Sequence, residues 1–544
     1  MTSTLPDQAT TAESSATSAP EGEPGGISRR GVLGGAAGVA LAVGASSVLG
    51  AAFAAPAEAA TSSGAGFLAS DFERHLLSRA TYGVNAESMA QIRHMGPTKW
   101  LEWQLRPTAI KDPVSDALLR RLQVLDNTPI WRVNYLINTN RIDGYQQLFA
   151  PTTAHMIRAI WSRRQLLTQM EELWSDLFNV TVPHDGIAEM RAHYQFTIRQ
   201  YSLGKFSDLL WAISSHPAML TYLNNRDSTA DAPNENQGRE LMELHSVGVD
   251  AGYTEKDVLT SARILTGLSV NSDSSEYEYR PWQHWVGGIK VFGFRDNNHT
   301  QEGGQAVAYR WIKYLAHHPA TAKRISTRLL MRFVTDTPSK AQVASLAHTY
   351  LASGTEIKPV LRQLFHSHEF AQARGQKVRR PIEFLASTVR LLETQPDTLG
   401  LDGVNGLVDM VSNMGQQPFG WPMPNGYSDL APAWLSTATT LNRWNSTLAL
   451  AHRWYPSKLN TPDLIKTLFG NNIPTTHGAL VDAASKRLFG RTLAAPHRNA
   501  IFKFLGVSAG TPVHNSQNNI SPAIDYRLGD WVALLLDSPY HLYR

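Results

Sequence analysis

Apolar residues recur at the 3.6-residue spacing of an amphipathic α-helix from about Gly66 onward. Strand signals are few, and the clearest covers residues 286–293. Two long segments, 269–304 and 398–435, lack this periodicity and are rich in Gly, Pro, Asn and aromatic residues. We therefore expect a mainly α protein with a single large helical domain over 66–544. This would be a multi-helix globular body with long Gly/Pro/aromatic loops and little or no sheet.

Several predicted helices have recognisable starts. Thr254 can cap a helix that carries an acid, Asp257, three residues later. Pro319 and Pro381 stand where the first turn of a helix tolerates proline. The clearest predicted helices cover residues 153–180, 191–203, 205–225, 254–267, 305–317, 319–334, 340–353, 357–369 and 380–393.

Composition excludes several classes of protein. The 544 residues include no cysteine, so a disulfide framework, a thiolate metal site and a cysteine nucleophile are excluded. Any metal must be held by His, Asp, Glu or backbone oxygen. The 50 Lys and Arg exceed the 46 Asp and Glu by only four, and this small, unclustered surplus argues against nucleic acid as a partner.

Residues 1–60 have the features of a leader rather than of a folded domain. The first 26 residues are rich in Thr, Ser, Ala, Pro, Gly and Glu without apolar periodicity, so we expect disorder there. Arg29 and Arg30 then precede an uncharged run of Gly, Ala, Val and Leu, and Ala57-Glu58-Ala59 forms a small-residue cleavage site. This order is typical of a bacterial twin-arginine signal peptide.

The leader predicts export by the twin-arginine route, to the cell envelope or the extracellular space. The alternative is an uncleaved anchor, since about 23 uncharged residues could just span a bilayer. No second long apolar run follows, so we expect no stable membrane span after cleavage.

The segment DAPNENQGRELMELHSVGVDAGYTEKD at 231–257 carries the most chemistry. A helix should begin at Pro233-Asn234 and stop at Gly248. On that helix His245 lies among leucines on the face opposite the charges. One arc of about 140° collects the candidate catalytic residues Glu235, Arg239, Glu240 and Glu243 together with Asn236.

This arc admits three interpretations. It can be a solvated helix face with i,i+4 pairs between Glu235, Arg239 and Glu243. It can be a buried cluster in which Arg239 keeps one carboxylate ionised while another has a raised pKa, which suits acid–base catalysis. It can also be a carboxylate metal site with His245 as a further catalytic or ligating residue. His245 points about 140° away from Glu240 on an ideal helix, which argues against shared ligation.

The aromatic loop, residues 414–427, combines aromatic rings with side-chain amides. Aromatic faces stack on sugar rings and amides bond hydroxyl groups, so the loop suits a glycan-binding surface. The alternative is a structural loop that plugs a helical core with Phe and Trp. The candidate substrate-binding residues are Asn234, Asn236, Gln416, Gln417, Phe419, Trp421 and Tyr427.

Residues 233–258, PNENQGRELMELHSVGVDAGYTEKDV, resemble the central signature of the domain-of-unknown-function 1800 (DUF1800) family. The resemblance covers nearly all of 66–544 in order. It implies a mostly helical, exported bacterial protein but supplies no reaction. Family members are commonly encoded beside another exported family, which implies an exported partner protein from a neighbouring gene. Other similar segments include HLLSRATYG at 75–83, HPAMLTYLNN at 216–225, HHPATAKRISTRLLMRFV at 317–334, RRPIEFLASTVRLL at 379–392, MGQQPFGWPMPNGY at 414–427 and LLLDSPYHLYR at 534–544.

Two departures from the family pattern weaken a metal site. Many members carry Trp-x-Asn-His-Phe where this chain has WSDLF, with Asp176 and Leu177 in the Asn and His positions. Members often show His-Asp where this chain has His299-Thr300. Nearby residues that could compensate are His184, Asp185 and His193.

The sequence leaves three functions open. The first is a hydrolase or lyase acting on an extracellular glycan or other polymer, with an acid and a base drawn from Glu235, Glu240 and Glu243. The second is a metal-dependent oxidoreductase, because the twin-arginine route carries folded proteins whose cofactor is often already inserted. The third is a non-enzymatic envelope or partner-binding protein. The cofactor is unknown, with a divalent metal as the candidate.

Overall fold

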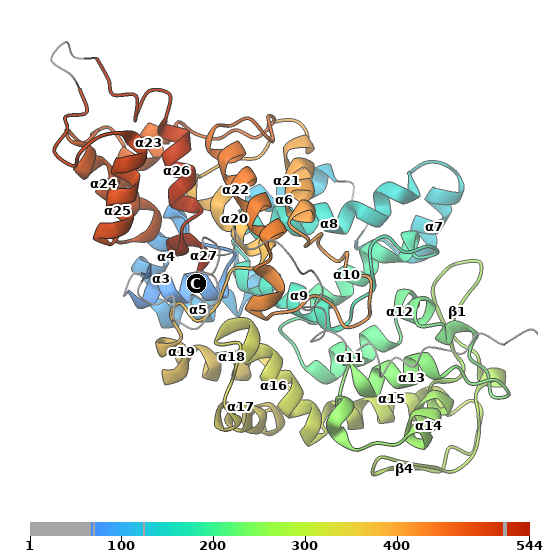
Figure 1. Ribbon diagram of the computed structural model, residues 1–544. Coiled ribbons are helices and arrows are strands. Elements are labelled where there is room, and N and C mark those ends of the chain that lie inside the picture. The colour runs from blue at the N-terminus through green and yellow to red at the C-terminus, as the bar shows by residue number, and fades with distance from the viewer. Residues whose placement is uncertain (1–66, 69–70, 123–125, 515–518) are drawn as a thin grey trace, which may run out of the picture. The chain divides into compact units, whose positions relative to one another are not determined.

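Short helices joined by turns make up most of the structure, a computed structural model that describes residues 67–68, 71–122, 126–514 and 519–544 (Figure 1). These residues belong to one unit, Ser63–Arg544. The predicted leader and signal peptide, residues 1–60, lie outside the described residues. In the described ranges, no helix combines the length and the apolar character needed to cross a bilayer.

The first half of the described chain contains α3 to α14. Their bounds are α3 Phe72–Ala80, α4 Ala86–Met95, α5 Pro97–Gln104, α6 Pro113–Arg121, α7 Ile130–Asn138, α8 Gly144–Trp161, α9 Gln165–Leu177, α10 Ala188–Tyr201, α11 Phe206–Ser214, α12 Pro217–Tyr222, α13 Glu235–Glu243 and α14 Glu255–Leu265.

The second half contains α15 to α27. Their bounds are α15 Gly304–Ala316, α16 Pro319–Phe333, α17 Lys340–Ala352, α18 Ile357–His366, α19 His368–Gln372, α20 Pro381–Leu391, α21 Asp402–Asn413, α22 Thr437–Ala451, α23 Leu464–Phe469, α24 His477–Phe489, α25 Ala495–Leu505, α26 Leu528–Leu536 and α27 Pro539–Leu542. Short 3-10 turns are η3 Pro107–Ala109, η4 Asn225–Asp227, η5 Val249–Ala251, η6 Pro281–Gln283 and η7 Ala431–Trp434.

Sheet in the described chain amounts to two small antiparallel hairpins. Strand β1 (Leu268–Val270) pairs with β2 (Tyr277–Tyr279), with Leu268 opposite Tyr279. Strand β3 (Ile289–Val291) pairs with β4 (Phe294–Asp296), with Ile289 opposite Asp296. The prediction of a mainly α protein with little sheet is therefore confirmed.

Several predicted helices are divided in the structure. The helix expected over 153–180 is two helices, because the Asp112 carboxylate bonds the Ser162 hydroxyl and the Arg163 N–H (3.0 Å) and so turns the chain between them. The helix expected over 205–225 breaks before Pro217, which cannot continue the ladder of backbone bonds.

A local signal placed the start of α14 correctly, whereas two other boundaries differ from the prediction. The Thr254 side chain accepts the backbone N–H of Asp257, and the Asp257 carboxylate accepts the N–H of Thr254, which forms the predicted cap of α14. The α13 helix, expected to reach about Val247, ends at Glu243. The long loop expected over 398–435 contains α21, so its irregular part begins at Met414.

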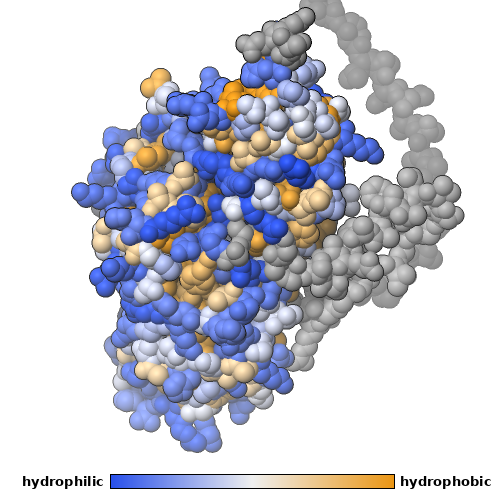
Figure 2. All heavy atoms as spheres, turned by 90° about the vertical axis from the view of Figure 1, so that its left-hand side faces the viewer, coloured by the Kyte–Doolittle hydropathy of each residue, from blue (hydrophilic) through white to orange (hydrophobic). Residues whose placement is uncertain are grey.

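The interior of this unit divides into two hydrophobic clusters. One gathers apolar residues from α3 to α19, among them Trp174 of α9 and Trp311 of α15. The other gathers α20 to α27 with Leu118 of α6 and one face of α8, including Met156. Figure 1 shows α13 to α15 and the hairpins at one end of the unit and α23 to α26 at the other. On the face shown in Figure 2, hydrophilic residues predominate and hydrophobic ones form small groups.

A glycine sets how closely α13 and α14 pack, and its replacement tests that packing. A Cβ at Gly238 would lie 2.6 Å from the backbone nitrogen of Ala262 in α14. We expect Gly238→Ala to lower the free energy of unfolding by about 2 kcal/mol or more, because the two backbones must move apart. Alanine is the better helix former, so propensity alone predicts the opposite sign.

Chemical denaturation of the purified protein measures this effect. The matched control is Gly288→Ala, where no atom lies within 4 Å of the added Cβ, and we expect a change within about 0.5 kcal/mol. Equal stability of the two variants would contradict the close approach of α13 to α14.

Candidate functional site

The charged arc of α13 is divided between surface and interior. Arg239 donates to Glu235 one turn earlier (3.1 Å) and to Glu255 at the start of α14 (2.7 Å). The Glu235 side chain is 43% exposed, whereas Glu240 is only 5% exposed. Glu243 is half-buried. The arrangement contains the i,i+4 pair of a solvated helix face, and it ties α13 to α14 through Arg239.

At the start of α13, the side chain of Asn234 bonds the helix backbone. The Asn234 side chain accepts the backbone N–H of Asn236 (3.0 Å) and so caps the helix. Both residues are half-buried. Asn234 therefore has a structural role at the position where the sequence suggested substrate contact.

His245 lies in the core beyond the end of α13. Its ring packs against Phe178, with the ring centroids 5.2 Å apart. Burial, together with the charge of Arg324, lowers the pKa of His245 to about 3. The imidazole is thus neutral at physiological pH, and its Nε2 atom is buried without a hydrogen-bond partner.

The described residues contain no group of three or more His, Asp and Glu arranged to hold a metal ion. His193 Nδ1 lies 3.0 Å from His216 Nε2, in a pair of stacked rings. His184 Nδ1 instead lies 2.8 Å from the backbone carbonyl of Asp185. The three residues that could compensate for the altered family positions are therefore engaged in separate local contacts.

The aromatic loop turns most of its candidate residues inward. Gln416, Phe419 and Tyr427 are buried, while Gln417 and Trp421 are half-buried. The Phe419 carbonyl accepts the N–H of Val182 (2.9 Å), and the Gln417 side chain donates to the Val182 carbonyl (3.0 Å).

A cation–π contact and two hydrogen bonds hold the middle of the loop. The Arg191 guanidinium lies 5.0 Å from the centre of the Phe419 ring. The Trp421 indole donates to Asn425 (2.8 Å), and Asn179 donates to the Trp421 carbonyl (2.7 Å). The loop is therefore a built part of the core whose outer edge, near Trp421, reaches the surface.

The inner side of the loop lies on carboxylates of α9. Gln416 Nε2 donates to Glu172 (3.3 Å), and the Tyr427 N–H points to Asp176 Oδ1 (3.4 Å). Gly426 has a φ of +67°, and a Cβ there would lie 1.9 Å from the Asp176 carbonyl oxygen. Only glycine permits this approach of the loop to α9.

Five charged residues beneath the loop form what we call the carboxylate cluster: Glu172, Asp176, Arg332, Arg380 and Asp429. Arg332 donates to Asp176 (2.8 Å) and lies 3.4 Å from Glu172. Arg380 donates to Glu172 (2.9 Å) and lies 3.4 Å from Asp176. Asp429 Oδ1 lies 2.5 Å from Arg332 Nε. All five residues are buried.

The carboxyl groups of the cluster differ in acidity. Burial, reinforced by the charges of Glu172 and Asp429, raises the pKa of Asp176 to about 7 despite the two arginines. Burial also opposes ionisation of Glu172 and Asp429, but there Arg332 and Arg380 prevail and lower the pKa of both. Near neutral pH one carboxyl group is thus half protonated beside two ionised ones, a pattern found at acid–base sites.

The sequence contains one short-range signal for this site. Glu172 and Asp176 are four residues apart, so helical spacing alone places them on one face of α9. Asp176 also marks a departure from the family pattern. The arginines come from α16 and from the turn before α20, and no spacing rule connects those segments with α9.

The raised pKa of Asp176 makes stability depend on pH. Unfolded aspartate titrates near 3.8 and folded Asp176 near 7, so the folded state binds the proton more tightly. The stabilisation is complete below pH 4 and is lost as pH rises through 7. We expect wild type to lose on the order of 2 to 4 kcal/mol relative to Asp176→Asn between pH 5 and pH 8.

Denaturation of both proteins at several pH values measures the difference. Asn resembles protonated Asp in shape and charge, so the variant should fold. Asp537, whose pKa burial also raises to about 7, supplies an independent comparison as Asp537→Asn. A wild-type-minus-Asp176→Asn difference that is constant across this range would contradict the raised pKa.

Comparison with known proteins gives one match. The family model described as "Protein of unknown function (DUF1800)" matches residues 75–543. Neither the curated proteins nor the solved structures gave a match. The matched span includes α13, the aromatic loop and the whole carboxylate cluster, and it takes in most of the sequence. The chain therefore belongs to the DUF1800 family.

Proposed function

We propose that this protein is an exported hydrolase or lyase acting on an extracellular glycan or other polymer, with its chemistry in the carboxylate cluster. One observation carries the proposal. Glu172 and Asp176, one turn apart on α9, are both buried and bonded to the same two arginines. In this setting burial raises the pKa of Asp176, while the arginines lower that of Glu172. The acid and the base are then Asp176 and Glu172 of α9 rather than residues of α13.

The two carboxyl groups have opposite roles in proton transfer: one is the acid and the other is the base. Protonated Asp176 donates its proton to the oxygen that leaves when the scissile bond breaks. Ionised Glu172 accepts a proton, from the attacking water in hydrolysis or from the substrate carbon in elimination. Carboxyl groups one helical turn apart fall in the range of roughly 5 to 10 Å that glycoside hydrolysis uses. Arg332 and Arg380 stabilise negative charge that develops between them.

Substrate reaches the pair when the aromatic loop moves away from α9. Gly415 and Gly426, both in left-handed conformations, stand near the two ends of the loop and supply backbone freedom for this movement. Trp421 and the exposed Met423 lie on its outer side. An indole there can stack on a sugar ring, and closure of the loop then excludes water from the cluster.

Conservative variants test the assignment. We expect Asp176→Asn and Glu172→Gln to lower kcat/KM by at least about a hundredfold, since each removes a proton-transfer group without changing shape. Glu235→Gln and Glu243→Gln on α13 are the matched controls and should retain wild-type turnover. Reducing-end and unsaturated-product assays on a panel of polysaccharides measure both reaction types.

Three results would contradict the proposal. Loss of turnover in Glu243→Gln but not in Asp176→Asn would place the chemistry on α13. A polymer that binds without being cleaved would favour the non-enzymatic alternative. A near-stoichiometric transition metal in the mature protein, purified without chelator, would favour the oxidoreductase alternative.

A further inference from the structure

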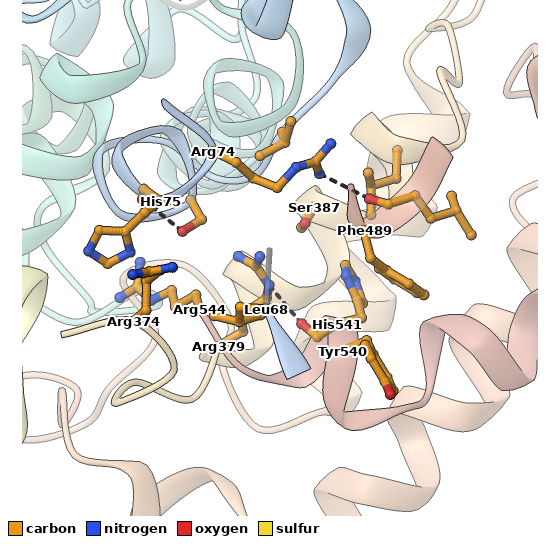
Figure 3. A pocket seen from close by; sticks show the side chains of 14 residues that line it. Leu68, Arg74, His75, Arg374, Arg379, Ser387, Phe489, Tyr540, His541 and Arg544 are labelled. Carbon is orange, nitrogen blue, oxygen red and sulfur yellow. Dashed lines mark hydrogen bonds between the residues drawn. The ribbon is translucent and has the colours of Figure 1, made fainter. Parts of the chain in front are cut away.

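A second polar site lies where α3, the segment before α20, α24 and α27 meet (Figure 3). It encloses a cavity of about 40 Å³. This space is large enough for at least one water molecule, which needs roughly 10 to 15 Å³. The site is separate from the carboxylate cluster, and the inference below does not depend on the proposed enzymatic function.

The charge of this pocket is unbalanced. Arg74, Arg374, Arg379 and Arg544 line it, and none of its lining residues is acidic. Arg544 bonds Glu383 (2.9 Å), but that carboxylate also serves Arg380. Arg74 lies only at the limit of an ion pair with Asp71, at 4.0 Å.

The remaining arginines lack even this compensation. Within the described residues, neither Arg374 nor Arg379 forms an ion pair. Burial, with the nearby positive charge of Arg544, lowers the pKa of Arg379 to about 9. Burying these positive charges is therefore unfavourable, because no matching set of carboxylate side chains offsets it.

Donor groups at the pocket are also left without acceptors. Arg379 Nε donates to the carbonyl of His541 (2.8 Å), which fixes the guanidinium but leaves its Nη1 unpartnered. Arg544 Nη1 and Ser387 Oγ are likewise buried without a hydrogen-bond partner. All three residues are more than nine-tenths buried. A buried donor without an acceptor is costly, so this set indicates a missing acceptor.

The geometry points to a tetrahedral oxyanion, a phosphate or sulfate group free or as an ester, as the ligand of this pocket. The donors are Arg379 before α20, Ser387 of α20 and Arg544 after α27, so they approach from several directions. A tetrahedral group presents oxygens in several directions, whereas a carboxylate presents two in one plane. Guanidinium groups bind such oxyanions with charge-assisted, often paired hydrogen bonds.

Titration of the full mature protein with sodium phosphate and with sodium sulfate tests the inference, at neutral pH and constant ionic strength. Calorimetry gives the dissociation constant, and the melting temperature should rise with either oxyanion. Sodium acetate and sodium chloride serve as the carboxylate and ionic-strength probes, and we expect no saturable binding of either. The oxyanion that binds more tightly identifies the class of ester.

Three variants locate the binding. Arg379→Gln and Ser387→Ala should each weaken oxyanion binding by about tenfold or more, the loss expected for one charge-assisted hydrogen bond. Arg374→Gln should weaken it in the same direction, and Arg374 is only half-buried, so that variant should fold. The matched control is Arg310→Gln, which removes the same charge from a side chain that is 51% exposed. Its affinity should equal that of wild type.

The inference is overturned if acetate or chloride reproduces the response, or if neither oxyanion binds. It is also overturned if Ser387→Ala and Arg374→Gln bind as tightly as Arg310→Gln. Those two variants keep the test decisive even if Arg379→Gln does not fold, because Ser387 loses only an unpaired hydroxyl group.

Discussion

The interaction on which the rest of the structure depends is the burial of Arg332 and Arg380 among the carboxylates of α9. Removing these charges from water costs several kcal/mol for each ion, and only close partners offset that cost. Arg332 comes from a helix of the first hydrophobic cluster, and Arg380 immediately precedes α20, which belongs to the second. The same ion pairs that keep α9 charged therefore also hold the two halves of the interior together.

Sequence reasoning reached the fold more completely than the site. Helical periodicity and short-range signals such as Thr254 and Pro381 depend only on neighbouring residues, and they identified most elements. Breaks such as the one at Ser162 depend on Asp112, fifty residues away in the chain. The carboxylate cluster is harder still, since its members come from four separate segments. Only the spacing of Glu172 and Asp176 can be read from the sequence.

The α13 segment and the aromatic loop, which hold the candidate residues of the sequence, have different roles in the structure. The charges of α13 join two neighbouring helices through Arg239, and Asn234 caps the helix. The contacts of the aromatic loop are those of a structural plug, and its sugar-binding role stays a prediction. Its inner residues close over α9, while Trp421 lies toward the surface. The sequence of an amphipathic helix predicts which face is buried. The contacts of a loop depend on distant segments, so its own sequence does not predict them.

Glu383 gives the molecule an electrical connection between its two polar sites. This single carboxylate bonds Arg380 of the carboxylate cluster and Arg544 of the arginine pocket. An anion bound at Arg544 would add negative charge near Glu383 and so change the electrostatic potential at both ion pairs. By thermodynamic reciprocity, occupancy of the pocket and the proton affinity of Asp176 would then be linked quantities. A carboxylate shared by two arginines can therefore couple the charge states of the two sites.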